Sequence, residues 1–192
     1  FKPAVVNRVV TKNAELFVET EDYEKLAKFI EGKVEDLYGY VESSNEYDYE
    51  GRAGRSGFMT IRIPAKDLEA FITSIEGEAT VRTKTIKTAD ITSNYVDTES
   101  KINALVGEQS TLLDLLSKAK SLSETIQIQD RLTEVRSELQ YYEGMKLRME
   151  NEVQYSSVTI DIEEVTHAAA SGSGFWYDVK TGFTDRSEEH TS

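Results

Sequence analysis

The residue types in this chain that could do chemistry are carboxylates, tyrosines and one loop of glycine and arginine. The carboxylates gather in two groups. The first is Asp36, Glu46, Asp48 and Glu50, and the second is Asp161, Glu163 and Glu164. Carboxylates in pairs can bind calcium or cleave a glycosidic bond. Neither group has the spacing of a calcium loop, so we interpret both as solvated strand faces. A carboxylate-dependent glycan hydrolase stays open as the alternative.

The loop contains Gly51, Gly54 and Gly57 together with Arg52 and Arg55, so it could hold an anion. It lacks the Gly-Lys-Ser/Thr ending of a phosphate loop, and no helix is expected to follow it. We therefore interpret it as the loop of a β-hairpin.

Tyrosine is enriched just before that loop, at Tyr38, Tyr40, Tyr47 and Tyr49. Aromatic side chains on a strand face can bind a glycan or a partner protein. They can equally pack across strands within a half-buried sheet. Both readings stay open, and the period-two alternation predicts that Val41 and Tyr47 share a face.

Composition excludes several classes of function. The chain of 192 residues has no cysteine, which excludes disulfides, thiol nucleophiles and Cys-zinc sites. The two histidines, His167 and His190, both lie in the C-terminal tail, so a histidine-dependent site is not expected within the fold. The net charge of −13 disfavours nucleic acid, since binding a polyanion requires an excess of Lys and Arg. We expect no cofactor, no metal and no catalytic residue.

Hydrophobic patterning predicts an α+β fold. Strands are expected at residues 9–19, 40–49, 58–63 and 79–89, with helices after the first and third of them. This β-α-β-β-α-β order is that of a ferredoxin-like antiparallel sheet. A final strand is expected at Val153–Glu163, beside the strand at 79–89. The domain would then span residues 8–165, with a linker and tail from 166 to 192.

Two leucine-rich segments before that final strand predict a long helical hairpin inserted at 97–151. Their apolar residues recur in steps of three and four, as in an antiparallel coiled coil. Ser121 and Glu124 match a capping box and mark the turn between the arms. Counting outward from that turn gives the register: Leu116 faces Ile128, Leu112 faces Leu132, Leu105 faces Leu139, and Ile102 faces Tyr142.

The motif at the base of the hairpin combines Asp90, Thr92, Tyr95 and Asp97. Asp90 or Thr92 can accept hydrogen bonds from the free N–H groups of the first helical turn. Asp97 can pair with Lys101 four residues on, and Tyr95 counts to a position opposite Met149. We interpret the motif as structural.

Several segments together resemble a bacterial family known as domain of unknown function 4349. They are G-Y-V-E-S-S at Gly39–Ser44, I-R-I-P-A at Ile61–Ala65, D-I-T-S-N-Y-V-D at Asp90–Asp97, I-Q-x-x-L-x-x-V-R-x-E-L-Q at Ile128–Gln140, and V-Q-Y-S-S-V-T-I at Val153–Ile160. The resemblance covers residues 8–183. It implies an extracytoplasmic, membrane-anchored domain, often a surface lipoprotein and in places linked with envelope signalling. It implies no established activity.

The C-terminal tail fits such an anchor. Residues 168–174 are small, as in a linker, and Phe175, Trp176 and Tyr177 suit a membrane interface. We expect the natural protein to continue into a membrane helix. In this sequence, the foreign-looking R-S-E-E-H-T-S at 186–192 stands where that helix would follow. The function expected is a non-enzymatic binding, sensor or scaffold module. A protein partner would dock on the helical hairpin or on the tyrosine-rich sheet face.

Overall fold

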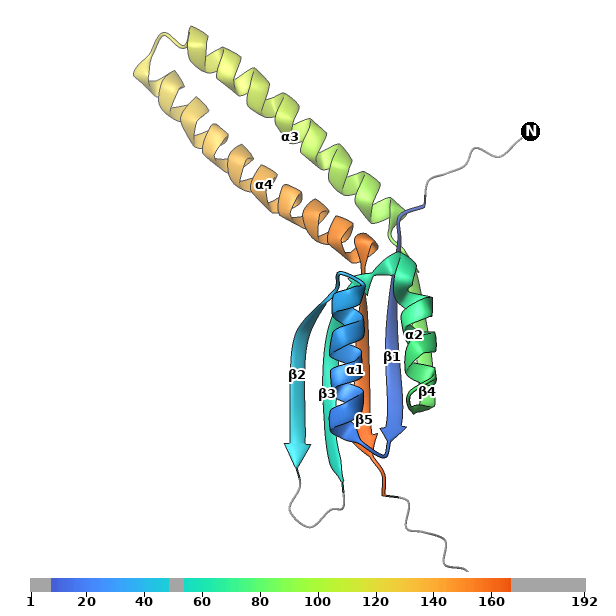
Figure 1. Cartoon of the computed structure of the whole chain (residues 1–192). Coiled ribbons are helices and arrows are strands. Elements are labelled where there is room, and N and C mark those ends of the chain that lie inside the picture. The colour runs from blue at the N-terminus through green and yellow to red at the C-terminus, as the bar shows by residue number, and fades with distance from the viewer. Residues whose placement is uncertain (1–7, 49–53, 167–192) are drawn as a thin grey trace, which may run out of the picture.

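The computed structural model describes residues 8–48 and 54–166, which form a five-stranded sheet, two helices packed on it and a helical hairpin (Figure 1). The expected α+β class is confirmed. In chain order the elements are β1 (Val10–Thr20), α1 (Tyr23–Asp36), β2 (Tyr40–Asp48), β3 (Arg55–Pro64), the 3-10 turn η1 (Ala65–Asp67), α2 (Leu68–Glu76), β4 (Thr80–Asp90), α3 (Thr92–Lys118), α4 (Leu122–Gln154) and β5 (Tyr155–Glu164).

The strand order of the sheet is β2-β3-β5-β1-β4, so the last strand enters the middle of the sheet. The expectation that it lies beside β4 is wrong, because β5 pairs parallel with β1 and antiparallel with β3. The sheet is therefore mixed rather than wholly antiparallel. Burial explains the placement. Ser156, Val158, Ile160 and Ile162 of β5 are all buried, and a strand that hides every second side chain gains most from two neighbours.

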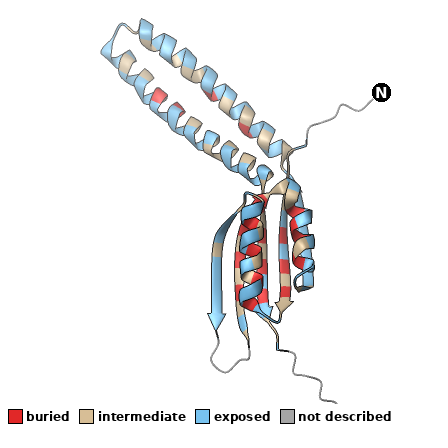
Figure 2. Ribbon diagram, viewed as in Figure 1, coloured by how far each residue is buried: buried red, intermediate tan, exposed pale blue. Residues whose placement is uncertain are grey.

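Helices α1 and α2 cover one face of the sheet and form the core with it (Figures 1 and 2). Asp22 starts α1 by accepting a hydrogen bond from the backbone N of Lys25 at 3.0 Å, as an N-cap residue does. From α1 the buried residues are Tyr23, Leu26, Ile30 and Val34, and from α2 they are Leu68, Phe71, Ile72 and Ile75. Each such apolar side chain contributes about 1.5–3 kcal/mol by leaving water.

A β-bulge in β2 decides which of its side chains share a face. The pairing with β3 shifts register between Val41 and Ser43, so the extra residue is Glu42. Val41 then pairs with the buried Ile61, on the helix side. Tyr40 and Tyr47 pair with residues of the opposite face. The predicted sharing of a face by Val41 and Tyr47 is wrong, because alternation continues only where the pairing has no bulge.

The hairpin projects from one end of the sheet, and its two arms are antiparallel (Figure 1). The arms are longer than expected, at 27 and 33 residues. Ser121 caps α4 by accepting from the backbone N of Glu124 at 3.2 Å, which confirms the predicted start of the second arm. The buried side chains of the hairpin are Thr98, Leu105, Leu132 and Val135.

Polar contacts flank the apolar interface between the arms. Arg131 donates from Nε to Glu108 at 2.7 Å, and Lys146 donates to Glu99 at 3.0 Å. These contacts place the region around Leu105 opposite the region around residues 135–140. The residue-by-residue register, including Leu105 against Leu139, stays a prediction.

A hydrogen-bonded network closes the base of the hairpin. The Asp90 carboxylate accepts from both the backbone N and the hydroxyl of Thr92, and the Thr92 hydroxyl accepts from the backbone N of Val9 at 2.9 Å. The expected role of Asp90 as an acceptor for the first turn is confirmed. Lys101 does not take the expected partner Asp97, because its ammonium lies 3.7 Å from a Glu138 oxygen on the other arm.

Tyr95 also ties the two arms together at this base. Its hydroxyl donates to Glu150 at 2.9 Å, one residue from the Met149 position predicted for it. Within residues 8–48 and 54–166, none of the helices combines the length and apolar character that a membrane span requires. The residues expected to form the linker, aromatic cluster and tail lie, from 167 onward, outside the described residues.

Candidate functional site

Two acidic residues predicted at the surface take part in structural contacts. The Glu164 carboxylate, at the end of β5, accepts from the backbone N of Tyr23 at 3.0 Å and from that of Arg55 at 2.9 Å. It thereby joins the start of α1 to the start of β3. Glu46 accepts from the Arg55 guanidinium at 3.2 Å. Arg55 is therefore engaged within the chain, and the other predicted anion-binding arginine, Arg52, lies outside the described residues.

The carboxylates do not gather into a metal site in the part of the chain that the structure describes. The first group stays spread along α1 and β2, at Asp36, Glu46 and Asp48, and Glu50 is not among the described residues. In the second group, Asp161 and Glu163 project from the exposed face of β5.

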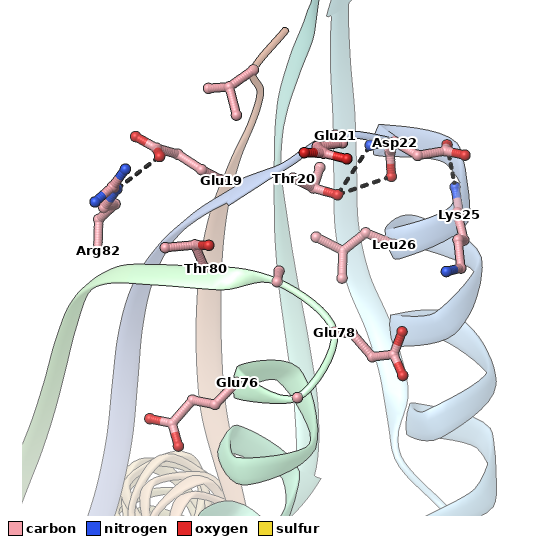
Figure 3. A pocket seen from close by; sticks show the side chains of 13 residues that line it. Glu19, Thr20, Glu21, Asp22, Lys25, Leu26, Glu76, Glu78, Thr80 and Arg82 are labelled. Atoms are coloured by element: carbon pink, nitrogen blue, oxygen red, sulfur yellow. Dashed lines mark hydrogen bonds and ion pairs between the residues drawn. The ribbon is translucent and has the colours of Figure 1, made fainter. Parts of the chain in front are cut away.

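An acidic cleft lies at the end of the sheet remote from the hairpin (Figures 1 and 3). It has a volume of about 590 Å³ and lies between the β1–α1 junction and the α2–β4 turn. Its charged lining residues are Glu19, Glu21, Asp22, Lys25, Glu76, Glu78 and Arg82. Part of this charge is already compensated, because Arg82 donates to Glu19 at 2.7 Å.

The carboxyl groups of the described ranges whose pKa is clearly shifted all shift downward. A general acid for glycoside hydrolysis needs a pKa raised by its surroundings. The clearly shifted carboxyl groups of the described ranges are Glu24, Asp90 and Glu108. Their pKa values are lowered, chiefly by hydrogen bonds from Lys28, Thr92 and Arg131 respectively.

A different surface stands out, the face of the sheet opposite α1 and α2. In the described residues no helix covers it (Figure 1). We call it the open sheet face and define it by side chains that strand pairing places on one side. Its aromatic members are Phe17, Tyr40, Tyr47, Phe58 and Tyr155. Phe17, Phe58 and Tyr155 are half-buried, whereas Tyr40 and Tyr47 are exposed.

The aromatic residues of the open sheet face are arranged around a carboxylate and an arginine. Asp161 of β5 pairs with Phe17 on one side and with Phe58 on the other, so one exposed carboxylate lies between two rings. Arg62 pairs with Tyr40 and forms an ion pair with Glu42 at 3.2 Å. The rings of Tyr40 and Tyr155 lie 6.3 Å apart.

The open sheet face also carries the charged residues Glu15, Glu19, Lys87 and Glu163. Small polar side chains lie between them. They are Asn13, Ser43, Asn45, Ser56, Thr60, Thr83, Thr85, Ser157 and Thr159. A surface of aromatic rings set among hydroxyl and amide groups can bury apolar area and offer hydrogen bonds at the same time. Both properties are typical of protein interfaces.

The tyrosine prediction located only part of this surface. Tyr40 and Tyr47 belong to it, and Tyr49 lies outside the described residues. Tyr38 is on the loop after α1 with a positive φ of 58°, and its side chain is 88% exposed. Phe17, Phe58 and Tyr155 were missed. The alternation of buried and exposed positions along β1, β3 and β5 could have found them once the strand order was known.

Comparison with known proteins gives one match. A family model described as a domain of unknown function, DUF4349, matches residues 8–189. No curated protein and no solved structure matches the chain.

Proposed function

The chain belongs to the domain of unknown function 4349 family, and from that premise we propose that it is a non-enzymatic binding module whose open sheet face docks a partner protein. The observation that carries the proposal is the uncovered row of Phe17, Asp161 and Phe58 across three adjacent strands. Half-buried aromatic rings flanking one carboxylate provide apolar anchors with a fixed polar group between them. Aromatic residues, phenylalanine among them, are enriched at protein interfaces.

The partner expected from this chemistry presents apolar side chains around a basic group. Asp161 would pair with a lysine or arginine of the partner, and Phe17 and Phe58 would contact the apolar neighbours. Asp161 is exposed in the free protein, and an exposed ion pair contributes little binding free energy. The pair across the interface contributes more if Phe17 and Phe58 exclude water from it.

The placement of the module is a second part of the proposal. It would act outside the cytoplasm as a membrane-anchored scaffold or sensor, in line with the family resemblance. Protease treatment of intact cells that carry the full natural protein tests this placement. Degradation of the domain supports it, and protection until the cells are lysed contradicts it.

Photocrosslinking in living cells tests the docking face. A benzophenone amino acid is placed at Phe58, and as a control at Glu31 on the solvent side of α1. The proposal expects a discrete crosslinked protein band from position 58 that is absent from position 31. Mass spectrometry then identifies the partner. Equal crosslinking from both positions, or none from Phe58 with the protein correctly folded, would reject the open sheet face as the docking surface.

The alternative of a glycan hydrolase requires two carboxyl groups converging in a cleft. The acidic cleft offers Glu19 and Glu76, but Glu19 is paired with Arg82 and Glu76 with Lys84. Release of reducing ends from cell-wall glycan by the purified protein, lost in Glu76→Gln, would favour the hydrolase over the binding module.

A further inference from the structure

The outward face of α4 has an unusual composition. Positions on the side opposite the buried Leu132 and Val135 recur in steps of three and four. They are Leu122, Ile126, Gln129, Thr133, Ser137, Gln140, Gly144, Leu147 and Asn151. None of these nine is charged, although charged side chains flank them along the whole helix. We call these nine positions the outer stripe.

Eight of the nine positions of the outer stripe are solvent-exposed within the described chain, and Gly144 is half-buried. Leu122 is 77% exposed, Ile126 is 51% exposed and Leu147 is 67% exposed. Gly144 leaves a notch, since a Cβ built there would meet only the Arg148 guanidinium, at 3.8 Å. A helix face that meets only water normally carries charged residues, and three- and four-residue steps without charge are typical of a helix-packing seam.

The stripe is complementary to itself when read in opposite directions. An antiparallel copy aligned about Ser137 and Thr133 sets Leu122 against Leu147, and Ile126 against the notch at Gly144. The same alignment sets Gln129 against Gln140, whose amides can donate to and accept from each other. Apolar side chains thus meet apolar side chains or the glycine notch, and polar groups meet polar groups.

We infer that the outer stripe is a dimerisation surface on which a second copy of this chain packs its own α4 antiparallel, about a two-fold axis. The length of the arm fits this arrangement. With Leu122 beside the partner's Leu147, the hairpin turn of one copy lies next to the last two turns of the other copy's α4, which ends at Gln154. Two arms therefore overlap along their length, and the tip of each stops before the sheet of the other.

The negative net charge of the chain favours self-association through an uncharged surface. A chain with a net charge of −13 repels its own copies over most of its surface. The outer stripe is a continuous uncharged strip along α4, so a second copy can pack on it without setting like charges of the stripe against each other. It is separate from the open sheet face, so dimerisation and partner docking can fail independently.

Engineered cysteines test the inference directly, because the natural chain has none. Proteins carrying Leu122→Cys alone and Leu147→Cys alone are mixed and oxidised mildly. The antiparallel dimer predicts a disulfide between the two different proteins. It predicts little crosslinking of Leu122→Cys with itself, since the two tips lie about 37 Å apart along the paired helices. Dominant tip-to-tip crosslinking would overturn the antiparallel arrangement.

The matched control uses two positions with the same separation of 25 residues on the outward face of α3, Ser93 and Lys118. A mixture of Ser93→Cys and Lys118→Cys is expected to crosslink at least tenfold less. Crosslinking equal to that of the α4 pair would show random collision and would overturn the proposal.

A charge placed at the centre of the stripe tests the same surface without crosslinking. Analytical ultracentrifugation is expected to show a dimer for the natural sequence and at least a tenfold weaker association for Ser137→Glu. Ser137→Ala should leave association unchanged. Circular dichroism checks that the glutamate variant keeps its helices. A natural sequence that is monomeric at about 100 μM, or equal association in Ser137→Glu, would refute the inference.

Discussion

Replacing Leu132 by alanine should destabilise the hairpin more than any other single truncation along α4. Leu132 is 1% exposed and lies beside the equally buried Val135, opposite the region around Leu105. Burying a leucine side chain is worth about 1.5–3 kcal/mol, and the cavity left by truncation adds to that. The expected loss in free energy of unfolding is therefore about 2–5 kcal/mol.

Two other leucines on the arms provide an internal scale. Leu139, predicted as the centre of the seam, is only half-buried in the structure, so Leu139→Ala should cost about 1–2 kcal/mol. Leu115 is 47% exposed, and Leu115→Ala should cost less than about 1 kcal/mol. The expected order of losses is thus Leu132, then Leu139, then Leu115.

Urea unfolding followed by circular dichroism measures these losses. At a slope near 2 kcal/mol per molar, a loss of about 3 kcal/mol lowers the midpoint by about 1.5 M. Hydrogen exchange of hairpin peptides shows whether the arms open before the sheet. A loss for Leu132→Ala no larger than that for Leu115→Ala would refute the packing described for the hairpin.

Three further changes have clear expectations. Gly107→Ala, in the middle of α3 with nothing within 4 Å of the added Cβ, should stabilise by about 0.5–1 kcal/mol in thermal melts. Ser156→Ala should stabilise by about 1 kcal/mol in urea melts, because it removes a buried hydroxyl that has no hydrogen-bond partner among the described residues. Hydrogen bonds from Thr92 lower the pKa of Asp90 below its ordinary value, so its contribution to stability is present above the ordinary pKa of an aspartate and lost as pH falls through the lowered pKa. NMR titration of the Asp90 carboxyl should therefore give a midpoint below that of an unperturbed aspartate, and Asp90→Asn should abolish this part of the acid sensitivity.

Local signals in the sequence identified most elements of this fold. Ser121 starts α4 in the structure as the capping box predicts, since a cap depends on neighbours within three residues. The apolar residues along the two arms predicted the hairpin because their three- and four-residue spacing is also a local signal. Its antiparallel direction follows from the short turn between the arms.

The arrangement of the strands depends on contacts between distant residues, and there the predictions were wrong. A single extra residue, Glu42, moves the later side chains of β2 to the opposite face from the one that alternation predicts. A bulge of this kind has no strong signature in one sequence. The composition of β4 could have predicted that β5 does not pair with it. Strand β4 reads T-V-R-T-K-T-I-K-T-A-D, and its lysines and threonines are typical of an edge strand exposed to water.

The sequence predicted only part of the open sheet face, because the composition of that face depends on the strand order. Phe17 and Phe58 come from β1 and β3, and they flank Asp161 only because β5 lies between those strands. Nothing in the spacing of three residues so far apart in the sequence indicates that they are neighbours. Tyr40 and Tyr47 of β2 do give a local signal, because they belong to the cluster of tyrosines from Tyr38 to Tyr49.

The affinity of the crosslinked partner for the purified protein tests the central claim most directly. Binding is compared between the natural sequence, Phe58→Ser and Lys28→Ser, the last on the solvent side of α1. We predict at least tenfold weaker binding for Phe58→Ser, or about 1.4 kcal/mol, and unchanged binding for Lys28→Ser. Equal affinity of Phe58→Ser and the natural sequence would contradict docking on the open sheet face.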